Sequence, residues 1–100
     1  MTAIFDQQED IYRRAMAKWG TVSQMLKAIE EMSELTAALM HWLGDRAGNE
    51  DVCEEIADVL ITARQLRLIF GEAVTDRIIE EKLNRLDHLI REREDEAMKK

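Results

Sequence analysis

Residues 22–43 read VSQMLKAIEEMSELTAALMHWL, an unbroken run of residues that favour the α-helix. An apolar stripe recurs in it at helical spacing, through Met25, Ile29, Met32, Thr36, Leu39 and Leu43. The block Glu30-Glu31-Met32-Ser33-Glu34 lies in the middle of this run. Its carboxylates at Glu31 and Glu34 are three residues apart, so they project from one side of the helix. We therefore predict a helix with an apolar core stripe and an acidic border.

Residues 50–70 repeat this design with a second acidic block, Glu54-Glu55-Ile56-Ala57-Asp58. Their expected core stripe consists of Val52, Ile56, Val59, Ala63, Leu66 and Phe70. Glu55, Asp58 and Thr62 border it. The short connection 44–48, which contains two glycines, favours an antiparallel helical hairpin. In such a hairpin the two acidic borders face each other.

The whole chain has the composition of an all-α protein. It contains no proline, and its four glycines separate four expected helices, at about 4–18, 22–43, 50–70 and 74–95. We predict one all-α domain over residues 1–100, built as a four-helix bundle-like unit, with a fraying charged tail at about 92–100.

Charge and hydropathy restrict the partners. The net charge of −7 disfavours a nucleic-acid polymer, and no apolar run approaches the roughly 20 residues of a membrane span. One cysteine, Cys53, cannot form an internal disulfide framework, and acidic residues occupy the N-terminal region where a signal peptide would be basic and then apolar. A cytoplasmic location is therefore expected.

Further apolar strips predict self-association. They comprise Leu26, Ala37 and Met40 on the helix over 22–43, and Ala57, Ile61 and Leu68 on the helix over 50–70. Exposed apolar strips on a small protein usually mark a partner surface, so we expect a homodimer or a homotetramer. The alternative is that they are scattered surface residues.

The acidic blocks predict a metal site. Carboxylates converging from two helices repel one another, and a hard divalent cation such as Mg²⁺ takes oxygen ligands of this kind. Di-iron and di-manganese bundles instead use Glu-x-x-His pairs. His41 follows Ala38 by three residues and His88 follows Arg85, so neither histidine completes such a pair.

The combined pattern is Glu-Glu-x-x-Glu, a spacer of 20 residues and Glu-x-x-Asp. It resembles the MazG family of all-α nucleoside triphosphate pyrophosphohydrolases over roughly residues 15–90. The likeness includes Trp19-Gly20, Gln24, Lys27 and, later, Lys82 with Arg85.

The resemblance implies an enzyme, a Mg²⁺-dependent hydrolase with Mn²⁺ as an alternative cofactor. Its ligands would be Glu31, Glu34, Glu55 and Asp58, holding one or two ions. Water would attack the α-phosphorus of a nucleoside triphosphate, giving the monophosphate and pyrophosphate. Glu30 would orient that water or support the ligands, unless it is simply solvated, whereas Glu54 matches no ligand position.

Basic residues are candidates for contacts to the outer phosphates: Lys27, Lys82 and Arg85. Their alternative role is that of surface bases or partners in intrahelical ion pairs. The family often has another basic residue after the arginine, where this chain has Leu86.

The residues expected to contact the base or sugar each have a structural alternative. Gln24 either contacts the nucleoside or caps its helix together with Thr21. Trp19 or Trp42 either stacks on the base or packs in a core or interface.

A non-catalytic reading competes with the enzyme. In it the acids are solvated helix faces, and the chain is a helical oligomerisation or interaction module. It predicts no magnesium dependence and no hydrolysis of any nucleotide.

Overall fold

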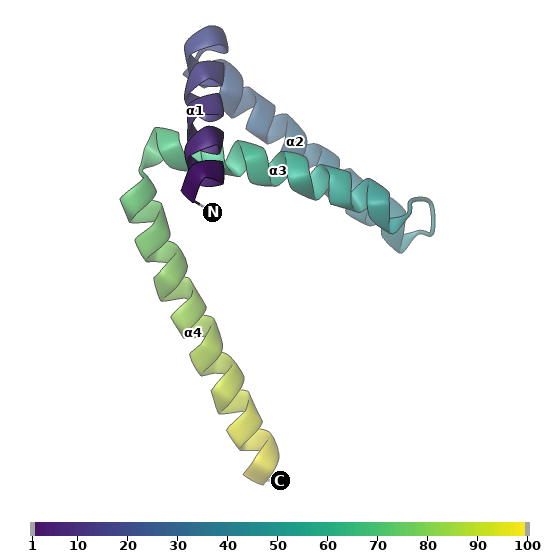
Figure 1. The fold of residues 1–100 in the computed structure, drawn as a ribbon. Coiled ribbons are helices and arrows are strands. Elements are labelled where there is room, and N and C mark those ends of the chain that lie inside the picture. Colours follow the sequence, from purple (N-terminus) through teal and green to yellow (C-terminus); the bar gives the residue numbers. More distant parts are fainter. Residues whose placement is uncertain (1, 100) are drawn as a thin grey trace. The chain divides into compact units, whose positions relative to one another are not determined.

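The computed structural model describes the backbone of residues 2–99 and the side chains of residues 8–99. It contains the helices α1 (Thr2–Trp19), α2 (Thr21–Leu43), α3 (Asn49–Phe70) and α4 (Glu72–Lys99) (Figure 1). No strand occurs in this described part, so the predicted all-α class is confirmed. Within the same residues, no helix combines the length and the apolarity that a membrane span requires.

The chain divides into two units, Met1–Ile69 and Phe70–Lys100. The single domain expected over residues 1–100 therefore stays a prediction.

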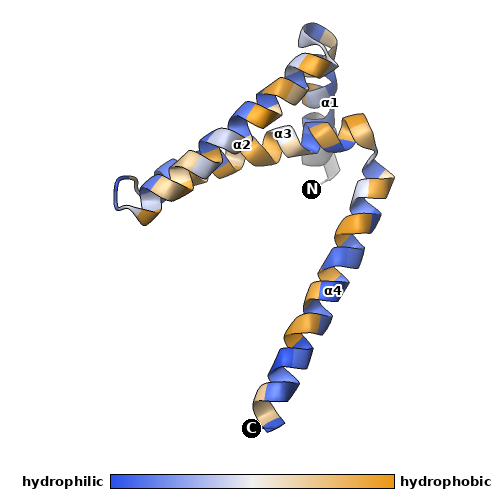
Figure 2. Ribbon diagram, turned by 180° about the vertical axis from the view of Figure 1, so that it is seen from behind, coloured by the Kyte–Doolittle hydropathy of each residue, from blue (hydrophilic) through white to orange (hydrophobic). Residues whose placement is uncertain are grey.

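In the first unit α2 and α3 lie side by side as the expected hairpin (Figures 1 and 2), with α1 against α2. Side-chain hydrogen bonds join helices of this unit. Trp42 Nε1 donates to Asn49 Oδ1 across the hairpin end at 2.8 Å, and Arg64 Nη1 on α3 donates to Gln8 Oε1 on α1 at 2.9 Å.

The buried residues of α2 lie one position before the expected core stripe, whereas Val52, Val59 and Leu66 of the stripe expected on α3 are half-buried. On α2 the buried residues are Gln24, Ala28 and Glu31, while the predicted stripe is exposed at Ile29 (57%) and Met32. On α3 the buried residues are Thr62 and Gln65, whereas Ile56 and Phe70 of the predicted stripe are exposed. Small and polar side chains therefore fill the seam between α2 and α3.

Ala28 helps to explain which side of α2 is buried, because the small methyl group of an alanine lets neighbouring backbones come close. Ala28 is 1% exposed, and it shares the core with Tyr12 as the only buried apolar residues among the described side chains. Several larger apolar residues of α2 are exposed, including Leu39 and the expected oligomer-strip residues Leu26 and Met40. Hydrophobic colour recurs along α2 accordingly (Figure 2).

The hairpin turn ends α2 with a residue in the left-handed region. That residue is Asp45, with φ of 57°, while Gly44 has φ of −93°. The Asp45 N–H donates to the Trp42 carbonyl at 3.1 Å, and the Arg46 N–H donates to the His41 carbonyl at 2.8 Å. These two bonds form a Schellman motif, in which aspartate replaces the usual glycine.

The second unit contains α4, which continues as a helix as far as Lys99, the last described residue of the stretch expected to fray. Side-chain contacts one turn apart support α4: Arg91 Nε forms an ion pair with Asp87 Oδ2 at 3.2 Å, and His88 Nε2 lies 3.1 Å from Glu92 Oε1. No glycine or proline interrupts the segment. Hydrophobic colour recurs along α4 (Figure 2). The apolar residues Ile79, Leu83, Leu86 and Ile90 of this helix are exposed.

Candidate metal centre

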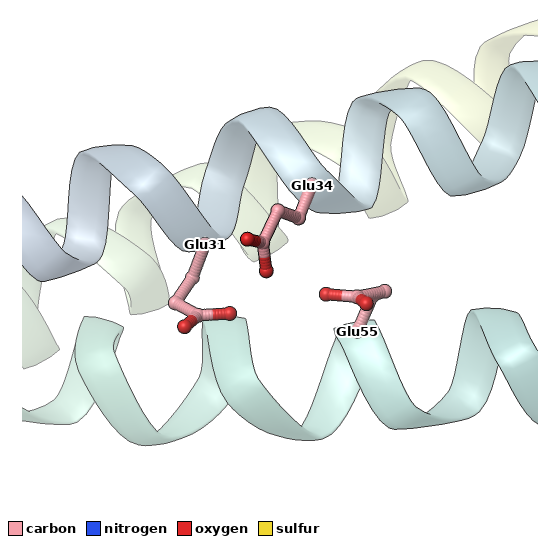
Figure 3. A group of neighbouring side chains, drawn as sticks. All are labelled: Glu31, Glu34 and Glu55. Carbon is pink, nitrogen blue, oxygen red and sulfur yellow. The ribbon is translucent and has the colours of Figure 1, made fainter.

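Three predicted ligands converge between α2 and α3. Glu31 and Glu34 extend from α2 toward Glu55 of α3 (Figure 3). One carboxylate oxygen from each lies within 4.8 Å of the others. The α-helical spacing places the first two on one side of α2, and the short turn at 44–48 brings α3 back beside them.

Glu31 is the most deeply placed of the three, at 5% exposure. Its Oε1 lies 3.1 Å from Nζ of Lys27, one helical turn earlier. The hydrogen bond with Glu31 is the largest cause that raises the pKa of Lys27, followed by the charge of Glu31. Lys27 therefore stays a cation and is engaged by a carboxylate of the cluster. This contact is the intrahelical ion pair foreseen as the alternative to a phosphate contact.

The cluster carries excess negative charge. The pKa of Glu34 is raised, first by the charge of Glu31, then by desolvation and by a hydrogen bond with Glu31. Like charges at this separation disfavour simultaneous ionisation. One ammonium group from Lys27 cannot neutralise three carboxylates.

Buried acceptor atoms in this seam lack partners. Oε2 of Glu31, Oε2 of Glu55 and Oε1 of Gln65 are buried without a hydrogen bond to any described group. An unpaired buried acceptor is costly, more so when it is charged. Two of these atoms belong to the carboxylate cluster, and hard oxygen donors are the ligands that Mg²⁺ and Ca²⁺ prefer. The donor set therefore fits a divalent cation.

Asp58, the fourth expected ligand, lies outside the group of three. Its side chain is one methylene shorter than glutamate, and it lies one turn farther along α3. Asp58 lines a cavity of about 160 Å³ together with Glu31, Gln24 and Gln65. It is thus beside the cluster without belonging to it.

Gln65 was absent from the predicted site. It continues the row Glu55, Asp58 and Thr62 at the same three-or-four spacing, and it is buried. Extending that row by one turn would have found it. Thr62 is buried as well, and its hydroxyl donates to the Asp58 carbonyl at 3.1 Å.

Gln24 does not cap α2, because that helix begins after Gly20 without a side-chain cap bond. The structural alternative for Gln24 is therefore wrong. Gln24 is buried and lines both the cavity beside Asp58 and a larger one of about 480 Å³. The larger cavity also contains Trp19, Lys27 and Glu30. Glu30 is exposed and takes no part in the carboxylate cluster.

Both tryptophans lie at the surface. Trp19 is 59% exposed, with Nζ of Lys18 5.3 Å from its ring centroid, so it is not a core residue. Trp42 is exposed and hydrogen-bonded to Asn49.

Lys82 and Arg85 belong to α4 in the second unit, where both are exposed, and their phosphate contacts stay predictions.

Comparison with known proteins adds no relative. No family model, no curated protein and no solved structure matches this chain. The functional interpretation therefore depends on the geometry above.

The raised pKa of Glu34 predicts how pH affects the metal-free protein. Because folding raises this pKa, the protonated form of Glu34 stabilises the folded state at pH values below its ordinary pKa of 4.5. This stabilisation is lost as the pH rises through the pKa that Glu34 has in the folded protein. Glutamine cannot ionise, so the Glu34→Gln variant does not lose this stabilisation. In EDTA its melting temperature should exceed that of the wild type, and the difference should grow from pH 4 to pH 8. Circular dichroism melts measure this difference. A difference independent of pH would contradict the assignment.

Proposed function

We propose that this protein is a magnesium-dependent nucleoside triphosphate pyrophosphohydrolase of the MazG-like kind. The observation that supports it best is the convergence of Glu31, Glu34 and Glu55, with unpaired oxygens of Glu31 and Glu55 buried between two helices. A purely structural seam would gain stability from apolar residues at these positions. The arrangement is costly without a ligand and favourable with a cation.

In this proposal Glu31, Glu34 and Glu55 hold the ion, and Asp58 joins them as a fourth ligand. When bound, Mg²⁺ supplies charge neutralisation for the phosphates and acidifies a water that can attack the α-phosphorus. Lys27 fixes the carboxylate of Glu31 through their ion pair.

Other residues would serve the substrate. Gln24 would contact the nucleoside from the cavity it shares with Trp19, and Glu30, which lines that cavity too, would orient the attacking water. Lys82 and Arg85 are proposed to contact the outer phosphates from α4.

A substrate screen tests the function. The full chain is incubated with the common and modified nucleoside triphosphates in turn, with Mg²⁺ or with EDTA, and released pyrophosphate and monophosphate are measured. We expect equal amounts of both products from at least one substrate, in the presence of Mg²⁺ alone. Orthophosphate with a diphosphate would instead indicate attack at the γ-phosphorus. The absence of hydrolysis for all substrates would contradict the proposal.

We also propose that the protein assembles as a homodimer or homotetramer. The exposed stripe of α2, which contains Ile29, Met32 and Leu39, supports this. The same stripe favours the competing function, a helical interaction module without catalysis. The substrate screen separates the two functions, because the module requires neither Mg²⁺ nor a nucleotide.

A further inference from the structure

A second groove adjoins the carboxylate cluster at the hairpin end of the first unit. Its volume is about 430 Å³, and it lies beside the turn that connects α2 and α3. Two residues of the cluster, Glu34 and Glu55, line it together with two further acids, Asp51 and Glu54. His41 and Arg46 line it as well. The groove therefore places a permanent cation beside the candidate metal site, on a segment that the sequence pattern did not single out.

The Arg46 backbone is held in place by the turn. Its N–H donates to the His41 carbonyl at 2.8 Å, as part of the Schellman motif around Asp45. Its guanidinium lies across Gly44, where an added Cβ would be 3.4 Å from Arg46 Nε and 3.7 Å from Nη2. Gly44 has an ordinary negative φ, so its backbone does not require glycine. These distances are ordinary van der Waals contacts, so the guanidinium lies close against the backbone of Gly44.

The guanidinium also has binding capacity. Among the side chains described at residues 8–99, Arg46 forms no ion pair. Asp51, an acid of the same groove, already accepts a hydrogen bond from the Gly48 N–H at 2.9 Å. A planar guanidinium with several N–H donors matches two oxygens of a phosphate group.

We propose that Arg46 binds the outer phosphates of the substrate, in the groove beside Glu34 and Glu55. This inference rests on the proposed function. It also gives the substrate a direction along the α2–α3 seam. The triphosphate would extend toward the hairpin turn, and the nucleoside would lie at the opposite end, where Gln24 and Trp19 line their cavity.

The charge of Arg46 then has a role in the reaction. The water oxygen bonds to the α-phosphorus, and the bond from that phosphorus to the bridging oxygen breaks. Pyrophosphate departs with the bonding electrons, while the proton of the water passes to solvent. Arg46 stabilises the negative charge that develops on this leaving group.

The test compares Arg46→Gln and Arg46→Lys with Arg14→Gln. Arg14 is an exposed α1 residue, 3.1 Å from Asp10, so its substitution removes the same charge far from the groove. The probe is inorganic pyrophosphate with Mg²⁺, titrated into each protein by calorimetry. Kinetics with the best triphosphate from the screen give KM and kcat.

We expect Arg46→Gln to weaken pyrophosphate binding about tenfold or more, as for the loss of hydrogen bonds to a charged group. KM should rise with it, Arg46→Lys should be intermediate because it retains charge but loses the planar fork, and Arg14→Gln should resemble the wild type. If the wild type hydrolyses triphosphates but both Arg46 variants bind pyrophosphate as it does, the role of Arg46 is overturned and the proposed function is not. A lower melting temperature with unchanged affinity would mean that Arg46 only stabilises the end of α2, and it overturns the proposal too. If the wild type hydrolyses no triphosphate, the proposed function fails first and this inference fails with it.

Discussion

Replacing Glu31 and Glu34 together with glutamine is expected to reduce Mg²⁺-dependent hydrolysis about 1000-fold or more. Both side chains lie in the carboxylate cluster, and metal-ion catalysis contributes several kcal/mol to lowering the barrier. Glutamine keeps the size and helical propensity of glutamate but removes the charge that attracts the cation. Helicity and oligomeric state should persist. Pyrophosphate release, circular dichroism and light scattering measure these outcomes.

A charge-matched control is available on α4. Glu94→Gln with Glu96→Gln removes the same two charges from exposed positions outside the cluster, and it should leave the rate unchanged. We expect Mg²⁺ to raise the melting temperature of the wild type, and the cluster variant should lose this rise. Full hydrolysis by the cluster variant would show that these acids have no catalytic role.

Replacing Leu39 with arginine is expected to dissociate the oligomer. Leu39 is an exposed member of the apolar stripe on α2, where it lines a surface pocket together with Val52 and Cys53 of α3. In a self-associated stripe it would be desolvated, and burial of an unpaired charge costs about 3 kcal/mol or more. The dissociation constant should therefore rise roughly 100-fold, which sedimentation or light scattering across a concentration series detects.

The matched control for this substitution is Met98→Arg, at a strongly exposed methionine near the end of α4. It introduces the same charge outside the stripe, and the assembly should tolerate it. A Leu39→Arg protein that keeps the wild-type mass at all concentrations would place the interface elsewhere, or would mean that the chain is a monomer.

Much of the fold was predictable because local signals agree. The helix formers, the glycines at helix ends and the short loop at 44–48 correctly indicated four helices and a hairpin between α2 and α3. The acidic spacing also placed Glu31, Glu34 and Glu55 together, because helical periodicity and hairpin geometry leave few other arrangements. These features depend on residues close in sequence.

The contents of the seam were not predictable from apolar periodicity. That pattern selected Ile29 and Met32 as core, whereas Ala28 and Glu31 are buried. Periodicity shows that a helix has an apolar side, but it does not say whether a neighbouring helix of the same unit or a second molecule covers that side. The same limitation hid Gln65, whose polar side chain gave no sign of burial.

By itself, the sequence determined the helices, their boundaries to within a few residues, and which acids share a helical side, because these properties follow from backbone geometry at a spacing of 3.6 residues per turn. Only the tertiary structure decided which side of α2 meets α3, since that choice depends on how closely two particular helices approach. It thereby left oxygens of Glu31 and Glu55 buried without partners, and it brought Arg46 to the groove that Glu34 and Glu55 line. The burial of these oxygens arises from the packing of one helix on another, which the local sequence of either helix does not determine.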